Sequence, residues 1–270
     1  MKVALCFWGL TRSLKYTIDN IQKNILQVLK RHNIQYTIFL HTYNFETTYV
    51  NPRAGEIDVC LDFEEYKLLN PTYFQIDNQD EIKSDIDVYQ YRTHGDPWES
   101  EFISLDNFIC AMYSKKQLGL MVKKSSIKFD YIIYLRPDVN YLHKLDIRIF
   151  NLINKYNVAT PNFHLFPKLN DRFAILKSCN LEKYANMFDK MYEYSLNNQL
   201  HSERFQYYTM VKIYKWNIRY ITIYFNRVRA NGIELQDAPN NKYKKKNESA
   251  SITPIETTKK PIKLLFKMKS

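Results

Sequence analysis

The stretch that decides the fold is Lys128-Phe129-Asp130-Tyr131-Ile132-Ile133-Tyr134-Leu135-Arg136-Pro137-Asp138-Val139. Its unbroken run of β-branched and aromatic residues predicts a strand buried on both faces, as in the centre of an α/β sheet. Pro137 has no N–H to donate to a neighbouring strand, so we expect the pairing to stop there. Open α/β sheets bind their ligands at the carboxyl ends of the strands. The sequence therefore predicts a functional site around Arg136 and Asp138.

Outward from this strand, the apolar pattern predicts alternating strands and helices. A strand at 3–8, a helix at 13–30 with apolar residues at spacings of three and four, and a strand at 35–40 form a βαβ unit, which requires parallel strands. A long helix at 100–124 leads into the strand that ends at Arg136. The remaining predicted elements are strands at 73–77, 158–160, 172–176 and 216–225 and helices at 181–197 and 203–214. We expect one α/β domain with a mostly parallel sheet flanked by helices.

Composition separates a core domain from a basic end. The chain has 270 residues, of which 45% are apolar, and a net charge of +11. From Lys242 to Ser270 there are nine lysines and two glutamates, so this segment holds +7 of the charge. We predict a folded domain at 1–232 and a basic, flexible tail at 233–270, which can make weak contact with a membrane surface or a polyanion.

The spacing of the cysteines and the length of the apolar runs predict where in the cell the protein is located. The four cysteines, Cys6, Cys60, Cys110 and Cys179, are scattered and show no C-x-x-C spacing. We interpret them as buried, reduced thiols, which predicts a reducing, cytoplasmic location. The apolar run at 3–10 is too short for a signal peptide. No run reaches the roughly 20 residues of a membrane span.

Candidate ligand-binding groups follow three of the predicted strands. Gly9-Leu10-Thr11-Arg12 opens a helix, where free N–H groups, the helix dipole and Arg12 can bind an anion; an ordinary turn is the alternative. Asp138 can hold Mg²⁺ or Mn²⁺, and Arg136 can fork onto a diphosphate. A structural Arg–Asp pair that caps the strand is the alternative. His41 ends the second strand at the same edge and can reach a ligand there.

Two later segments add candidate groups. Asp171 and Arg172 precede an apolar strand, where they can bind sugar hydroxyls and a phosphate, or start a turn and lie at the surface. Ser202 is a candidate N-cap, which places Glu203 in a first helical turn where the dipole favours an anion. Alternatively, Glu203 is a general base that deprotonates an acceptor hydroxyl. His201 is either structural or a further metal ligand.

The order of these motifs resembles that of GT-A glycosyltransferases, over roughly residues 2–225. The sequence is similar to sugar transferases of large DNA viruses and to bacterial polysaccharide-synthesis proteins of the WavE type. The matching segments are the G-x-x-R turn at 9–12, the H-T-Y cluster at 41–43, R-x-D at 136–138, D-R-F-A at 171–174 and S-E-R-F at 202–205.

This resemblance implies a GT-A (Rossmann-like) fold and the transfer of a sugar from a nucleotide-diphosphate donor to a glycan or protein hydroxyl. In this family a D-x-D motif holds Mn²⁺ or Mg²⁺ against the donor diphosphate. Arg136 replaces the first aspartate, so the ligand role falls to Asp138 and Arg136 can neutralise the diphosphate directly. Glu203 matches the base of inverting members, and Gly9 and Arg12 would line the nucleotide pocket. A viral member would act in the host cytoplasm.

Two other function classes stay open. A nucleotidyltransferase or phosphohydrolase on a similar sheet would release pyrophosphate or phosphate without an acceptor sugar. A non-enzymatic polyanion-binding protein would use the tail. Its binding would depend steeply on salt and would be lost on removal of residues 242–270.

Overall fold

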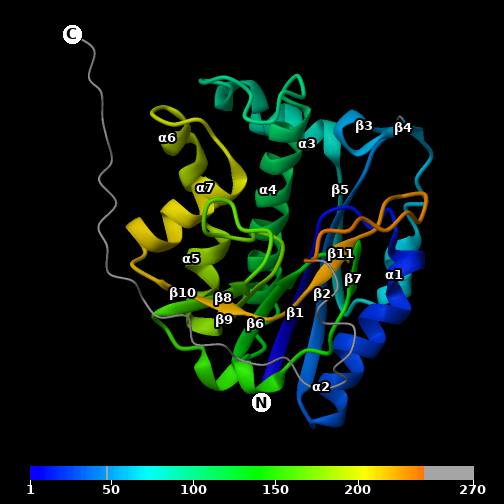
Figure 1. Cartoon of the computed structure of the whole chain (residues 1–270), viewed down its shortest axis with the longest axis vertical. Coiled ribbons are helices and arrows are strands. Elements are labelled where there is room, and N and C mark those ends of the chain that lie inside the picture. The colour runs from blue at the N-terminus through cyan, green and yellow to red at the C-terminus, as the bar shows by residue number, and fades with distance from the viewer. Residues whose placement is uncertain (47, 240–270) are drawn as a thin grey trace.

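A seven-stranded sheet forms the centre of the molecule (Figure 1), and the computed structural model describes residues 1–46 and 48–239. The strand order is β10-β8-β9-β6-β1-β2-β5. β6, β1, β2 and β5 are mutually parallel, β10 is parallel to β8, and β9 is antiparallel to both of its neighbours. The prediction of a mostly parallel α/β sheet is therefore confirmed. The strands are β1 (Lys2–Trp8), β2 (Gln35–Asn44), β5 (Tyr73–Asn78), β6 (Tyr131–Leu135), β8 (Asn157–Pro161), β9 (Ala174–Lys177) and β10 (Asn217–Ile221).

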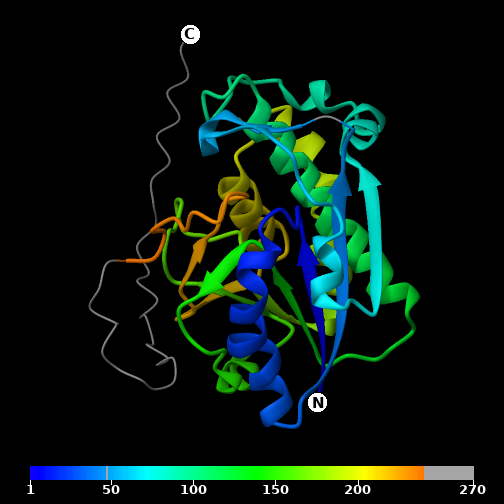
Figure 2. The same ribbon diagram turned by 90° about the vertical axis from the view of Figure 1, so that its right-hand side faces the viewer.

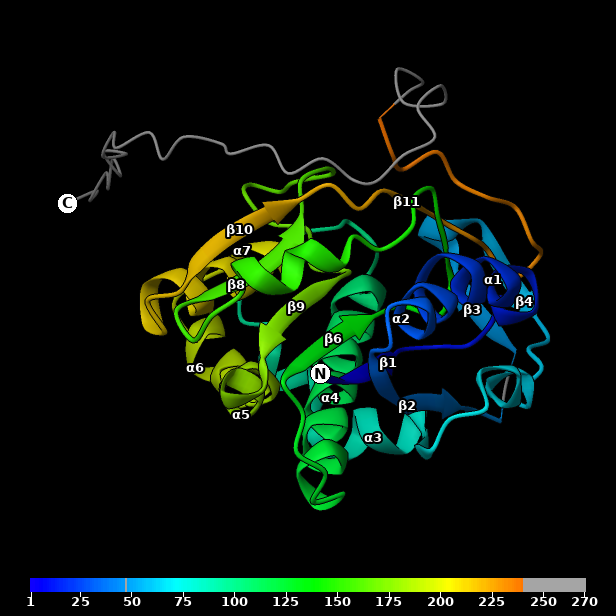
Figure 3. The same cartoon turned by 90° about the horizontal axis from the view of Figure 1, so that it is seen from below.

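Helices cover both faces of this sheet (Figure 3). Successive side chains of a strand point to opposite faces. Val3, Leu5 and Phe7 of β1 accordingly pack with α1, whereas Ala4 and Cys6 belong to the core on the α4 side. Strands β1 and β6 are buried on both faces, as their unbroken apolar runs predict. The helices are α1 (Leu14–Ile21), α2 (Gln27–Arg31), α3 (Gln79–Ile86), α4 (Ile103–Lys124), α5 (Leu181–Ala185), α6 (Met191–Ser195) and α7 (Ser202–Tyr207).

Shorter helical segments connect these elements. A π-helical turn at Gln22–Leu26 joins α1 to α2, and another at Tyr208–Ile213 continues α7. The helix expected at 181–197 is interrupted, because α5 ends before a separate 3₁₀ turn leads into α6. The 3₁₀ segments are Pro52–Ala54, Glu65–Leu69, Val88–Tyr91, Ile147–Leu152, Ser178–Asn180 and Phe188–Lys190.

Two small antiparallel pairs lie near the carboxyl ends of the central strands (Figures 1 and 2). Strands β3 (Tyr49–Asn51) and β4 (Glu56–Val59) form a hairpin between β2 and β5, where the sequence analysis assigned no strand. Strand β7 (Val139–Tyr141) follows β6 directly and pairs with β11 (Phe225–Arg227). Pairing of β6 stops at Leu135, as Pro137 predicts.

The prediction of a single strand at 216–225 is wrong, because the structure has two strands there. β10 ends at Ile221, and Ile223 then donates its N–H to the Ile221 carbonyl at 3.1 Å. This tight turn redirects the chain, so Phe225 begins β11 in a different sheet. The consequence matters for the site, because β11 runs past the carboxyl end of β6 rather than along β8.

The predictions about the cysteines, the basic tail and membrane spans can be compared with the described part of the chain. All four cysteines are free, but Cys60 and Cys179 are exposed, so burial holds for Cys6 and Cys110 alone. Most of the predicted basic tail, 240–270, lies outside the described residues, and the boundary at 232/233 stays a prediction. No described helix combines the length and apolar character that crossing a membrane requires.

Candidate functional site

Two adjoining cavities open at the carboxyl ends of β1 and β6. The first has a volume of about 170 Å³ and is lined by four arginines; we call it the arginine cavity. The second has a volume of about 510 Å³ and is lined by Asp171 and Glu203; we call it the carboxylate cavity. Both cavities are lined by the same five residues at their border, which are Trp8, Asn107, Ala111, Arg136 and Arg227.

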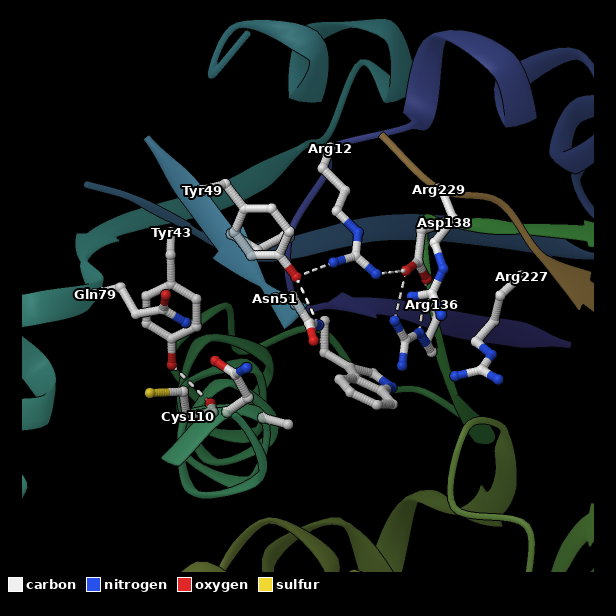
Figure 4. Close-up of a pocket in the computed structure, with 15 residues that line it drawn as sticks. Arg12, Tyr43, Tyr49, Asn51, Gln79, Cys110, Arg136, Asp138, Arg227 and Arg229 are labelled. Carbon is white, nitrogen blue, oxygen red and sulfur yellow. Dashed lines mark hydrogen bonds and ion pairs between the residues drawn. The ribbon is translucent and has the colours of Figure 1, made fainter. Parts of the chain in front are cut away.

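The wall of the arginine cavity is centred on Asp138 (Figure 4). Nε of Arg136 donates to Asp138 Oδ1 at 2.6 Å, and Nη2 of Arg136 donates to Oδ2. Nη2 of Arg12 donates to Oδ2 at 3.3 Å from the other side. Burial by itself would raise the pKa of Asp138, but Arg136 and Arg12 outweigh it and lower the pKa to about 2. Asp138 is therefore an ionised carboxylate at neutral pH.

Glu56 of β4 does not line the cavity but pairs with two of its arginines. Arg12 Nη1 lies 3.1 Å from Glu56 Oε2 and also donates to the Tyr49 hydroxyl. Arg229 Nη1 lies 3.7 Å from the same Glu56 oxygen, and the backbone N–H of Ala230 donates to Glu56 Oε1 at 2.8 Å. The β3–β4 hairpin is thus fastened to the segment after β11 through one carboxylate.

Arg227 completes the arginine set at the border of the two cavities. It forms a fork onto Asp237, with Nε 2.8 Å from Oδ2 and Nη2 2.7 Å from Oδ1. Four guanidiniums therefore face three carboxylates, those of Asp138, Glu56 and Asp237. One positive charge is in excess, so the cavity suits an anion.

The carboxylate cavity contains a pair of acidic side chains in different environments. Glu203 on α7 accepts a hydrogen bond from Ser202 Oγ, and Oε2 of Glu203 lies 3.2 Å from His201 Nδ1. Burial, together with the charge of Asp171, raises the pKa of Glu203 from 4.5 to about 7. A carboxylate with a pKa near the working pH is suited to exchange a proton with a ligand.

Lys115 of α4 fixes the position of Asp171, the other acidic residue of this cavity. Its Nζ donates to the Asp171 carbonyl and to Gln206 Oε1, both at 3.0 Å, and lies 4.4 Å from the centroid of the Trp8 ring. Burial lowers the pKa of Lys115 to about 8. Burial would raise the pKa of Asp171, but Lys115 and Arg172 outweigh it and lower the pKa. Asp171 thus stays ionised while Glu203 titrates, which separates the chemistry of the two carboxyl groups.

Aromatic rings line part of the carboxylate cavity. The His201 ring is stacked on Trp98, at a centroid distance of 4.8 Å, and contacts the tilted ring of Phe166 at 4.6 Å. The cavity thus combines aromatic rings with charged and polar side chains that converge on it, as a site for a polar small ligand does.

The structure brings together most of the residues that the sequence predicted. Gly9, Arg12, Arg136 and Asp138 line the arginine cavity, and Asp171, Arg172 and Glu203 line the carboxylate cavity with Arg136. The predictions of their individual roles stay predictions.

His41 is the exception, because it lines neither cavity. Its ring is fully buried, with Nδ1 3.0 Å from Ser114 Oγ and Nε2 3.0 Å from Asp77 Oδ2. Ser114 Oγ also accepts a hydrogen bond from the Gly9 N–H at 3.2 Å. His41 therefore supports the ends of β1 and β2 from behind the site. Because Ser114 is fully buried as well, this Ser-His-Asp array is closed to a substrate.

Three residues of the site were missed by the sequence reasoning. Arg227 and Arg229 are two positions apart in Asn226-Arg227-Val228-Arg229, a spacing that places both on one face of an extended segment. The spacing of these two arginines could have marked them in the sequence as a candidate anion-binding pair. Lys115 sits in the middle of a long helix, and no local pattern marks it.

The residues around Asp138 do not fit a divalent cation. Mg²⁺ requires about six oxygen ligands. Both oxygens of Asp138 instead accept hydrogen bonds from guanidiniums, and further arginines line the cavity. Across residues 1–46 and 48–239, no group of three or more His, Cys, Asp or Glu side chains could hold a metal ion. The metal-ligand role of Asp138 remains a prediction that its own contacts do not favour.

Comparison with protein-family models and with curated protein sequences gives no match. Several solved structures of glycosyltransferases are similar in fold. The apo form of GlyE from Streptococcus pneumoniae TIGR4 has 11% identity and a TM-score of 0.39, over 80% of this chain and 44% of that chain. The galactosyltransferase LgtC, in complex with donor and acceptor sugar analogues, has 8% identity and a TM-score of 0.42, over 78% and 70%.

A third similar structure is a glycosyltransferase involved in glycosylation of the major capsid of PBCV-1, with 10% identity and a TM-score of 0.35 over 81% of each chain. This chain spans less than half the length of the GlyE chain. These similarities are low, and the roles of individual residues are argued below from this chain alone.

Proposed function

We propose that the protein is a glycosyltransferase. It binds the diphosphate of a nucleotide-sugar donor in the arginine cavity and places an acceptor hydroxyl of a glycan or glycoprotein beside Glu203. One observation supports this best: four guanidiniums and a buried carboxyl group with a pKa of about 7 line two cavities that share a border. Anion binding and proton transfer are the two tasks that sugar transfer from a diphosphate requires.

The diphosphate would lie against Arg12 and Arg136. Guanidinium groups offer planar, paired N–H donors that match phosphate oxygens. Gly9 and Leu10 line the same cavity. The first N–H groups of α1 already donate to Thr11, Glu65 and Ser13, so the charge that binds the anion comes from the guanidiniums. The sugar would then cross the shared border, beside Trp8, toward Asp171 and Glu203.

The reaction we propose inverts the anomeric carbon. The acceptor oxygen forms a bond to that carbon while the bond from the carbon to the diphosphate oxygen breaks. The bonding electron pair leaves on the diphosphate, where the guanidiniums stabilise the charge. The acceptor proton passes to a carboxylate oxygen of Glu203. Asp171, ionised at neutral pH, accepts hydrogen bonds from sugar hydroxyls.

The test has a binding step and a transfer step. A thermal-shift screen of UDP, GDP, CMP and dTDP should find one nucleotide that raises the melting temperature by mass action. Sugar donors that contain this nucleotide are then incubated with a panel of glycan acceptors. The released nucleotide and the glycosylated product are measured. Release that needs no acceptor would instead favour a nucleotidyltransferase or phosphohydrolase.

Glu203→Gln and Glu193→Gln are the matched variants. Glu193 is an exposed glutamate of α6 that lines neither cavity. We expect Glu203→Gln to keep the nucleotide-induced thermal shift and to lose transfer, with Glu193→Gln behaving as wild type. Unchanged transfer by Glu203→Gln would remove Glu203 as the base, and the absence of any nucleotide shift would contradict the donor site.

A further inference from the structure

We infer that the arginine cavity binds the donor diphosphate without a divalent cation, and that Arg227 and Arg229 supply the charge that a metal ion would otherwise provide. This inference rests on the proposed function and concerns the same site. Three features support it: the contacts of Asp138, the unused donors of the arginines, and the way β11 is fixed.

The contacts of Asp138 leave no place for an ion. Asp138 is 1% exposed, and a cation bound to either oxygen would have to displace a guanidinium. A displaced Arg136 would then lie next to the ion without its carboxylate partner, and a displaced Arg12 would keep only Glu56. An additional cation in a cavity that already has an excess positive charge is electrostatically unfavourable.

The arginines retain donors for a ligand. The hydrogen bonds of the Arg136 side chain with the described residues use Nε and Nη2, and those of the Arg227 side chain use the same two atoms. Nη1 of each forms none with the described part of the chain. Nε of Arg12 and Nε of Arg229 are buried and also have no partner there. Buried donors of this kind are costly unless a ligand satisfies them.

The position of Arg227 and Arg229 is fixed by the backbone. Arg227 pairs with Val139 in the β11–β7 register, and the N–H of Val228 donates to the Asp138 carbonyl at 2.9 Å. The backbone at Val228, between the two arginines, is therefore fastened to Asp138, whose carboxylate accepts hydrogen bonds from Arg136 and Arg12. Groups held this way need little reorganisation to meet a diphosphate, which favours binding.

The experiment measures binding of UDP, GDP, CDP and dTDP by isothermal titration calorimetry, in excess EDTA and in excess Mn²⁺. Arg229→Gln is the test variant, because its carboxylate partner Glu56 keeps Arg12 and the Ala230 N–H. Arg148→Gln is the matched control, since Arg148 also pairs with a carboxylate, that of Asp146, but lines neither cavity. Arg229→Lys keeps the charge without the planar fork, and melting temperatures verify that each variant is folded.

We expect one nucleoside diphosphate to bind in EDTA with an affinity within about threefold of that in Mn²⁺. Arg229→Gln should weaken binding about tenfold or more, because it removes a charge-assisted hydrogen bond. The affinity of Arg229→Lys should lie between those of Arg229→Gln and the wild type. Arg148→Gln should not change binding.

Binding that occurs in Mn²⁺ and disappears in EDTA would overturn the metal-free site and leave the proposed function standing. Binding in neither condition would overturn both. Binding in EDTA that is equal in wild type and Arg229→Gln would show that Arg229 has no part in holding the diphosphate.

Discussion

Arg136 and Arg12 hold Asp138 from two sides, so that each of its carboxylate oxygens accepts a hydrogen bond from a guanidinium. Arg136 is two residues away in the chain, whereas Arg12 is 126 residues away. The aspartate therefore fixes the geometry of two cations that come from different strands. Its role in this structure is to position arginines, and this has measurable consequences.

Asp138→Asn should tighten the binding of a nucleoside diphosphate in EDTA and destabilise the free protein. The change removes one of three carboxylates from four guanidiniums, so the excess positive charge rises. Loss of one partner of a buried ion pair lowers the free energy of unfolding by about 3 kcal/mol. Calorimetric titration and thermal unfolding measure the two effects. A metal-ligand role for Asp138 would give the opposite result on binding, namely weaker affinity that Mn²⁺ no longer improves.

The turnover of the wild-type protein should rise with pH through a midpoint at about 7. The pKa of Glu203 is raised to about 7, and a general base acts in its deprotonated form. The hydrogen bond from Ser202 lowers this pKa, so Ser202→Ala should move the midpoint to higher pH. The measurement is kcat/KM as a function of pH for both proteins, because this ratio reports pKa values of the free protein. Identical midpoints would show that Glu203 is not the group being titrated.

Glu203→Gln should stabilise the protein at alkaline pH but not at acidic pH. Between pH 4.5 and about 7 the folded chain holds more protons on Glu203 than the unfolded chain does, so stability falls as pH rises through this window. The neutral glutamine removes that penalty, which is worth about 1–3 kcal/mol at pH values above the window. Denaturant unfolding at a pH below and a pH above the window, with Glu193→Gln as control, measures it. A gain in stability that is the same at both pH values would contradict the assignment.

Lys115→Met should lower turnover while leaving the affinity for a nucleoside diphosphate unchanged. Lys115 positions Asp171 and Gln206 in the carboxylate cavity and does not line the arginine cavity. Because the pKa of Lys115 is lowered to about 8, wild-type turnover should also fall above that pH as the lysine loses its charge. The variant should lack this alkaline decline. A variant whose pH profile keeps the decline would assign it to another group.

Gly119→Ala should destabilise the fold. Gly119 of α4 faces α5, and a methyl group there would overlap the Cβ of Ala185. Overpacking of this kind costs about 1–3 kcal/mol. Gly95→Ala is the control, because a Cβ at Gly95 has open space around it. Chemical denaturation of both variants gives the comparison. Equal stability of the two would mean that the helices separate without cost.

The sequence by itself determined the layout of the core. β1, β2 and β6 and the helix that begins at Leu14 were predictable because burial on one or both faces leaves a local periodicity in the chain. The end of β6 was predictable because Pro137 interrupts pairing locally. The functional edge followed from the rule that parallel strands present their carboxyl ends together.

Tertiary structure alone decided which charges meet at that edge. Asp138 meets Arg12, Arg12 meets Glu56, and Lys115 meets the Asp171 carbonyl. Each of these contacts joins segments that are tens of residues apart or more. It also placed His41 behind the site rather than in it. The reason is physical: periodicity records which face of an element is buried, whereas an ion pair depends on where two elements finally lie, and no local pattern contains that distance.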